Sequence, residues 1–175
     1  HLSPEGIVNS FAVMEEWNRD LQGIPVCAVA TSAVREARDG QAFLAEVRWR
    51  FGWHCRIASG AEEGALSFCG AVSTIPADTV VAVLDIGGGS TEVALGKDGH
   101  VTWSHSYPLG AVRLTAAEQM GIRELKEVRK RCDETWLRQP VKPEKLIGVG
   151  GTLTSLAAID ARMDVYDPER VDGYV

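Results

Sequence analysis

The sequence predicts an α/β fold, because segments with helical spacing alternate with short apolar runs. Each of these runs is nearly all apolar, which is typical of a strand covered on both faces. The strongest one spans residues 79–86 and leads directly into a run of glycines. The chain has 175 residues, 45% of them hydrophobic and 24% charged, so it can bury a core as one large or two small domains. A change in composition near Pro76 predicts two lobes, residues 1–76 and 77–175.

The first lobe is predicted to begin with an amphipathic helix. Ser3 is its N-cap, Pro4 occupies its first position, and apolar residues then recur at helical spacing up to Leu21. Asp39 is the predicted N-cap of a second helix, which ends at Gly52. The elements expected up to residue 75 are this first helix, a strand over 25–30, a helix over 39–51, a strand over 54–58 and a helix over 61–75.

The second lobe is predicted to begin with three strands. The strand over 79–86 is followed by the glycine run and by a second strand over 91–95. The dipeptide Asp98-Gly99 is a strong hairpin signal, and it predicts a third strand over 101–106. Helices over 112–120 and 124–137, a strand over 146–149 and a helix through Ile159 complete the expected order, which is that of an α/β protein.

The charge of the chain argues against two classes of partner. The net charge is −6 and the isoelectric point is near 5.2, so nonspecific attraction to nucleic acid or to an anionic membrane is not expected. The apolar runs are far shorter than the roughly 20 residues that a membrane-spanning helix needs. We therefore predict no nucleic acid and no membrane among the partners, and an anionic ligand would have to meet a local site.

The cysteines and histidines do not form a metal-binding pattern in the sequence. There is no C-x-x-C pair, and no two histidines have the i, i+4 spacing of a helical zinc pair. We therefore expect buried free thiols, no structural zinc and a cytoplasmic location. The four cysteines are Cys27, Cys55, Cys69 and Cys132.

The run from Asp85 to Glu92 is the first candidate site. A strand that ends in consecutive glycines lets the backbone turn sharply and lets amide N–H groups point at a bound anion. A glycine-rich hairpin turn is the structural alternative, and for the glycines alone we weigh the two equally. Asp85 closes one strand and Glu92 opens the next, so both carboxylates are expected at the same end of the sheet. Carboxylates beside a phosphate would repel it unless a divalent cation such as Mg²⁺ lies between them.

A second glycine loop, from Gly148 to Thr152, also follows a predicted strand and precedes a predicted helix. The N-terminus of that helix would add N–H donors for an anion. Glycines that allow close packing of helix on strand are the alternative reading. Neither loop matches the Walker pattern or the G-x-G-x-x-G dinucleotide fingerprint.

Four segments together resemble motifs of the exopolyphosphatase / guanosine pentaphosphate phosphatase (Ppx/GppA) family, in the family's order and over about residues 7 to 162. The resemblance implies a ribonuclease H-like α/β fold of the superfold shared by actin, sugar kinases and heat-shock chaperone ATPases, in which two lobes clasp phosphates in the cleft between them. The four segments are Ala30 to Ala37, Ser59 to Ala65, Asp85 to Glu92 and Gly148 to Thr152.

The resemblance also implies roles for single residues. Glu63 matches the general base; without the resemblance, a plain charged helix start is the favoured reading of Glu62 and Glu63, and with it Glu63 is the preferred one of the two. Arg35 matches an arginine that neutralises substrate charge, where a solvated surface arginine is the alternative. Asp85 and Glu92 match the positions that hold Mg²⁺. The expected phosphate-binding residues are Thr31, Ser32, Gly87, Gly88, Gly89, Ser90, Thr91, Gly150, Gly151 and Thr152.

The activity that the resemblance implies is Mg²⁺-dependent hydrolysis of a terminal phosphoanhydride bond. The substrate would be inorganic polyphosphate or guanosine pentaphosphate, with a homodimer of the full-length protein as a further expectation. Two alternatives remain at this point. One is a noncatalytic sensor that binds guanosine tetra- or pentaphosphate, and the other is an actin-like or sugar-kinase-like ATPase.

The chain departs from the family pattern at its start. Family members begin with a further phosphate loop of the type Asp-x-Gly-Ser on their first strand, and no residue before Ile7 can supply that strand. We therefore expect the first lobe to be incomplete and the C-terminal helices of the second lobe to be absent.

Overall fold

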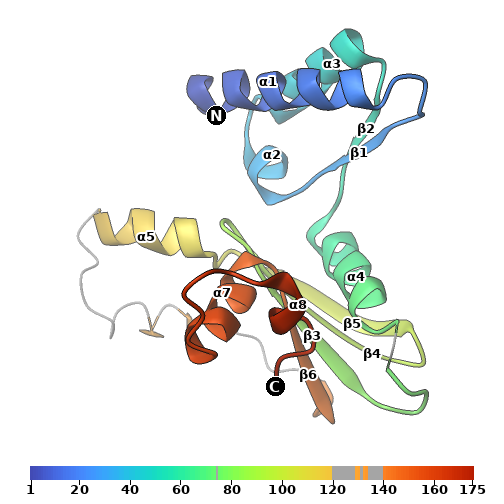
Figure 1. The fold of residues 1–175 in the computed structure, drawn as a ribbon, viewed down its shortest axis with the longest axis vertical. Coiled ribbons are helices and arrows are strands. Elements are labelled where there is room, and N and C mark those ends of the chain that lie inside the picture. The colour runs from blue at the N-terminus through green and yellow to red at the C-terminus, as the bar shows by residue number, and fades with distance from the viewer. Residues whose placement is uncertain (74, 120–128, 131, 134–139) are drawn as a thin grey trace. The chain divides into compact units, whose positions relative to one another are not determined.

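The computed structural model describes residues 1–73, 75–119, 129–130, 132–133 and 140–175, and these form two compact units (Figure 1). The first unit is His1–Ser59 and the second is Gly60–Val175. The sequence predicted a boundary near Pro76 instead. The division falls earlier because the helix that follows Ser59 packs against the strands of the second unit.

The first unit combines three helices with a pair of parallel strands. Helix α1 (Pro4–Asp20) begins at Ser3, whose hydroxyl accepts a hydrogen bond of 3.0 Å from the amide of Gly6, as the capping pattern predicts. Its apolar face packs on α3 (Gly40–Phe51) around a core of Phe11, Leu44, Val47, Trp53 and Cys55. Strand β1 (Cys27–Ala30) pairs in parallel with β2 (His54–Ile57), and α2 (Ser32–Glu36) follows β1 directly.

The second unit is built on a four-stranded mixed sheet with the strand order β5-β4-β3-β6. Strands β3 (Val81–Ile86), β4 (Thr91–Lys97) and β5 (His100–Tyr107) form an antiparallel meander. The chain then returns so that β6 (Lys145–Val149) lies parallel to β3. The helices of this unit whose bounds the structure describes are α4 (Gly60–Ala71), α5 (Ala111–Gln119), α7 (Gly151–Asp160) and α8 (Pro168–Val171).

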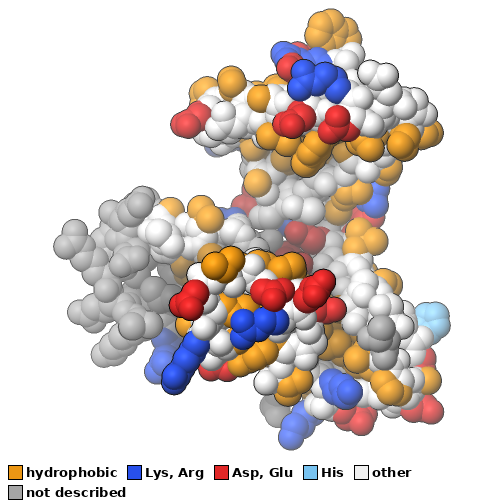
Figure 2. Space-filling view, in the orientation of Figure 1, with side chains coloured by type: hydrophobic (Ala, Val, Ile, Leu, Met, Phe, Trp, Pro, Cys, Tyr) orange, Lys and Arg blue, Asp and Glu red, His pale blue; other side chains and the backbone are white. Residues whose placement is uncertain are grey.

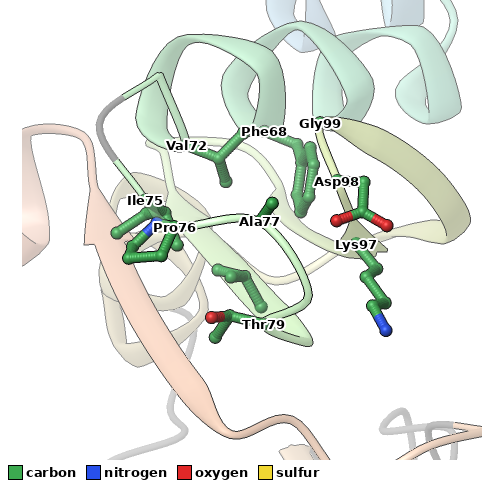
Figure 3. A pocket seen from close by; sticks show the side chains of 10 residues that line it. Phe68, Val72, Ile75, Pro76, Ala77, Thr79, Lys97, Asp98 and Gly99 are labelled. Atoms are coloured by element: carbon green, nitrogen blue, oxygen red, sulfur yellow. The ribbon is translucent and has the colours of Figure 1, made fainter.

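The two faces of this sheet bury different sets of residues, because side chains alternate along each strand. On one face, Phe68 of α4 packs against Val81, Val83 and Ala94. On the other face, Val93 and Tyr107 pack with Leu109. A cavity of about 180 Å³ lies beside Phe68, and Figure 3 shows its lining of apolar side chains together with Lys97 and Asp98. This cavity adjoins Val81 at the start of β3, at the opposite end of that strand from the glycine run.

Phe68 should be the most important anchor between α4 and the sheet. It is 1% exposed, and a β-carbon at Gly96 would come within 2.5 Å of its ring, so the contact is tight. We expect Phe68→Ala to lower the free energy of unfolding of this chain by about 3–5 kcal/mol, measured by urea denaturation. Leu66→Ala is the matched control, because Leu66 lies on the same helix and is 53% exposed. Equal losses from the two substitutions would contradict this assignment.

Most predicted elements are confirmed, and the differences have local causes. The Asp98-Gly99 turn is present, with φ of 53° and 74°. The predicted helix over 61–75 ends at Ala71. Asp39 stands at the N-cap of α3 but makes no cap bond, because its carboxylate accepts from the amide of Leu2 instead. Helices α2 and α8 were not predicted, and the helix predicted over 124–137 lies mostly outside the described residues.

The prediction of buried free cysteines is confirmed only in part. All four cysteines are free, as predicted, but only Cys55 is buried, and Cys27 and Cys69 are exposed. Cys27 is exposed because it lies on the face of β1 opposite to Ala28, which packs against the core of the first unit.

On the side of the molecule that Figure 2 shows, acidic and basic side chains are interspersed. Within the described residues, no helix is both long and apolar enough to cross a membrane.

Candidate active site

The two glycine loops begin at the same end of the sheet, where strands β3 and β6 finish. Strands β3 and β6 run in parallel with Asp85 opposite Val149, so their carboxyl ends coincide. Gly150 lies directly against the Asp85 carboxylate: a β-carbon at position 150 would be 2.5 Å from Asp85 Oδ1. Gly150 also has a φ of 84°, which favours glycine. Both the backbone conformation and the lack of space beside Asp85 therefore restrict this position to glycine.

The glycines of the second loop have separate roles. A β-carbon at Gly148 would lie 2.7 Å from Leu153 Cδ1, so this glycine allows α7 to pack closely on β6. The structural reading of the loop therefore holds for Gly148. Gly150 is the N-cap of α7 and supplies no side-chain cap, and the exposed Gly151 and half-buried Thr152 form the first turn. The amides of this first turn are the donors that could receive an anion.

A row of polar side chains runs across neighbouring strands at this end of the sheet. Asp85 of β3 is the direct partner of Glu92 on β4, and Glu92 is the partner of Ser106 on β5, so all three lie on one face. Ser106 Oγ donates a hydrogen bond of 2.6 Å to Glu92 Oε1. Ser67 Oγ, from α4, donates one of 2.8 Å to Asp85 Oδ2. The predicted juxtaposition of the two carboxylates is thus found, together with hydroxyl partners that were not predicted.

Helix α4 lies close to this row at Gly64, where an added β-carbon would be in ordinary van der Waals contact with its neighbours. A β-carbon at Gly64 would lie 3.5 Å from Glu92 Cβ and 3.4 Å from Ser104 Oγ. Ser104 Oγ also donates to the carbonyl of Ala61 at 3.0 Å, which ties the first turn of α4 to β5. This contact brings Glu63 near enough to Glu92 for their charges to interact.

The environment of Glu92 favours its protonated form. The residue is 2% exposed, and burial is the largest influence, raising the pKa of its carboxyl above the ordinary value. Hydrogen bonds from Ser106 and Ser90 act in the opposite direction, and the negative charges of Glu63 and Asp85 raise the pKa further. A cation placed beside this row would relieve both the repulsion and the cost of burying the charge.

The donor set of the row fits a hard divalent cation. Mg²⁺ prefers oxygen ligands and is commonly bound by one or two carboxylates together with substrate phosphates. Within the described residues, no group of three or more His, Cys, Asp and Glu side chains could hold a metal by itself. Asp85 and Glu92 therefore suit a site that the phosphates of a ligand would complete, rather than a protein-only metal cage.

The first glycine loop combines accessible backbone with buried side chains. The amide of Gly87 donates to the carbonyl of Ser90 at 3.0 Å, which closes the turn. Gly88 is exposed and Gly89 half-buried, whereas Ser90 and Thr91 are buried. The Thr91 hydroxyl donates to the carbonyl of Leu109 at 2.7 Å, so it stabilises the fold around the loop.

The remaining predicted residues belong to the first unit, where they cluster at the carboxyl ends of β1 and β2. Arg35 Nη1 donates to the carbonyl of Ala58 at 2.9 Å, just after β2. Thr31 is the exposed N-cap of α2. Ser32 is buried, and its hydroxyl donates to Glu36 Oε1 at 3.1 Å. The structure thus brings these three residues together within their own unit.

Sequence reasoning missed the residues that support the carboxylates, chiefly Gly64, Ser67 and Ser106. Ser67 follows Glu63 by four residues, so the two share one face of α4. Ser104 and Ser106 alternate along β5 with the same period as the carboxylate row, which places them on its face. These spacings are visible in the sequence, but they indicate a site only once the pairing of the strands is known.

The sheet order and the two loops at one edge identify the fold as the predicted ribonuclease H-like α/β class. Residues 1–173 match the model of the Ppx/GppA phosphatase family, and the chain belongs to this family.

Solved and curated relatives agree with this membership. The Ppx/GppA family member of Aquifex aeolicus is 30% identical, with a TM-score of 0.72 over 97% of this chain and 58% of its own. An exopolyphosphatase-like protein is 28% identical, with a TM-score of 0.80 over 95% of this chain and 58% of its own. Exopolyphosphatase 2 of Mycobacterium tuberculosis (strain CDC 1551 / Oshkosh) is 34% identical over 154 residues, which are 79% of this chain and 48% of that relative. The chain thus spans about half the length of that exopolyphosphatase.

Proposed function

We propose that the full-length protein is a Mg²⁺-dependent phosphatase that removes the terminal phosphate of inorganic polyphosphate, of guanosine pentaphosphate, or of both. The observation that carries the proposal is the carboxylate row of Asp85 and Glu92, placed beside Glu63 and next to both glycine loops. Membership of a phosphatase family and the likeness to an exopolyphosphatase support the same reading.

Asp85 and Glu92 would hold the cation, which when bound neutralises charge on the phosphates. Glu63 would accept a proton from a water molecule as the water oxygen forms a bond to the terminal phosphorus. The bond between the terminal phosphorus and the bridging oxygen breaks, and its electron pair stays on that oxygen, at the end of the shortened phosphate chain. Ser67 and Ser106 keep the two metal-binding carboxylates in place through the hydrogen bonds described above. The work of the protein in such a reaction is mainly positioning and charge stabilisation.

The glycine loops would supply backbone donors to the phosphate chain. The amides of Gly88, Gly89 and Ser90, and those at the start of α7, are suited to phosphate oxygens. Arg35 and Thr31, which lie close together in the first unit, remain residues predicted from the sequence to bind phosphate. We further infer a cytoplasmic location, for which the four free thiols are suited.

The proposal is tested by phosphate release from the full-length protein. Polyphosphate, guanosine pentaphosphate and ATP are each supplied with Mg²⁺ and, in parallel, with a chelator. We expect release from one or both of the first two substrates, with Mg²⁺ only. Tight binding of guanosine tetraphosphate without any release would support a sensor instead, and hydrolysis of ATP alone would support an ATPase; either result overturns the proposal.

A further inference from the structure

The start of α5 binds three consecutive carbonyl groups of the first glycine loop. The Gly87 carbonyl accepts from the amide of Ala111 at 3.0 Å, and the Gly88 carbonyl accepts from the amide of Arg113 at 3.0 Å. The Gly89 carbonyl accepts from Arg113 Nε at 2.7 Å. Arg113 therefore contacts the loop through both its backbone and its side chain.

The segment before α5 also presses against this loop. A β-carbon at Gly110 would lie within 2.4 Å of the Gly88 carbonyl oxygen and 2.6 Å of the Gly89 nitrogen, so only glycine allows this approach. At the end of the loop, Thr91 donates to the Leu109 carbonyl. The segment Leu109–Arg113, called the loop clamp below, thus contacts the glycine loop along its whole length.

These contacts fix the direction of the loop amides. A peptide group is planar and trans, so the N–H of one residue points away from the carbonyl of the residue before it. With the carbonyls of Gly87, Gly88 and Gly89 held by the clamp, the amides of Gly88, Gly89 and Ser90 must point away from α5. No residue that the structure describes accepts a hydrogen bond from these three amides. Successive amides that point the same way form an anion-binding concavity.

We propose that Arg113 is a positioning residue, which holds the glycine loop in its phosphate-binding conformation without contacting the phosphate. This inference rests on the proposed function, because it assigns a role to a residue behind the same site. Arginine suits the role because its guanidinium stays charged and its donors have a fixed geometry. A loop with several glycines has no stiffness of its own, so its conformation depends on such external contacts.

The test compares Arg113→Ala with Arg170→Ala in the full-length protein. Arg170 is an exposed arginine of the same unit and lies outside the site. Both substitutions are made in a Glu63→Gln background, so that the probe, inorganic tripolyphosphate with Mg²⁺, is not consumed. We expect Arg113→Ala to weaken binding of the probe by about 10- to 100-fold, the effect of losing one charged hydrogen bond, and Arg170→Ala to leave it unchanged. Arg113→Lys should recover part of the affinity.

Hydrogen exchange separates positioning from general stability. In the Arg170→Ala protein, the probe should slow amide exchange in the peptide that covers residues 86–91, and Arg113→Ala should abolish this protection while the unfolding midpoint stays within a few degrees. Equal affinity and equal protection in the two proteins would overturn the inference. So would a lack of protection in the control, or, if Arg113→Ala does not fold, full affinity in Arg113→Lys. Failure of the proposed function is distinguishable, since it appears as no phosphate release by wild type.

Discussion

Replacing Glu63 by Gln should lower the turnover of the full-length protein by about 10²–10⁴-fold, which is the usual contribution of a general base. The substitution keeps the shape of the side chain but removes the group that accepts the proton of the attacking water. Substrate affinity should not fall, because the same substitution also removes a negative charge near the phosphates. The measurement is steady-state phosphate release with saturating polyphosphate and Mg²⁺.

Glu62→Gln is the matched control for Glu63. Both residues lie in the first turn of α4 and both are half-buried, so the two substitutions remove the same charge from the same turn of the helix. The helix dipole should respond equally to both. If the two variants lose activity to the same extent, the effect belongs to the charge of the helix start, and Glu63 is not the base.

Replacing Glu92 by Gln should affect activity and stability in opposite directions. A bound cation contributes several kcal/mol of charge stabilisation in metal-assisted reactions, so loss of a carboxylate proposed to hold it should lower phosphate release by at least about 100-fold. In the absence of substrate and Mg²⁺, however, the variant should unfold at a higher temperature at neutral pH. The substitution removes a charge that is costly to bury, and the hydroxyls of Ser106 and Ser90 can still bond to the new amide.

The pH dependence of stability follows from the raised pKa of Glu92. Between the ordinary carboxyl pKa of 4.5 and the raised value, the folded chain binds more protons at this site than the unfolded chain. The contribution of Glu92 to the free energy of unfolding therefore falls as the pH rises through this window, and it levels off above the raised pKa. Glu92→Gln should lack this decline, whereas the exposed control Glu169→Gln should keep it. Parallel pH profiles for wild type and Glu92→Gln would contradict the assignment.

Local sequence signals were sufficient for most single elements. Ser3 and Pro4 predict the start of α1, because helix capping depends on a few adjacent residues. Asp98 and Gly99 predict a turn, because few residue types adopt a positive φ. The five-residue helix α2 is too short to show a hydrophobic period, so it was missed. The contact of α4 with the sheet could not be predicted from local signals, because it depends on residues far apart in the chain.

The residues of the candidate site also fall into those that local sequence signals could place and those that they could not. Asp85 and Glu92 could be placed together from the sequence, because only a tight turn separates them. Ser67 and Arg113 could not, because their contacts with Asp85 and Gly89 bridge 18 and 24 residues. Each reaches the site from a different helix, and no spacing within one element encodes which helix packs where.

The direct pairing of Asp85 with Glu92 makes the site depend on the register of β3 and β4. Side chains on a strand alternate between its two faces, so a shift of the pairing by one residue would exchange the faces of β4. Glu92 would then point into the layer that holds Tyr107, and Val93 would take its place beside Asp85. Insertion or deletion of a single residue within β4 is therefore incompatible with the site unless a bulge absorbs it, whereas the loop itself can change in length as long as Asp85 stays opposite Glu92.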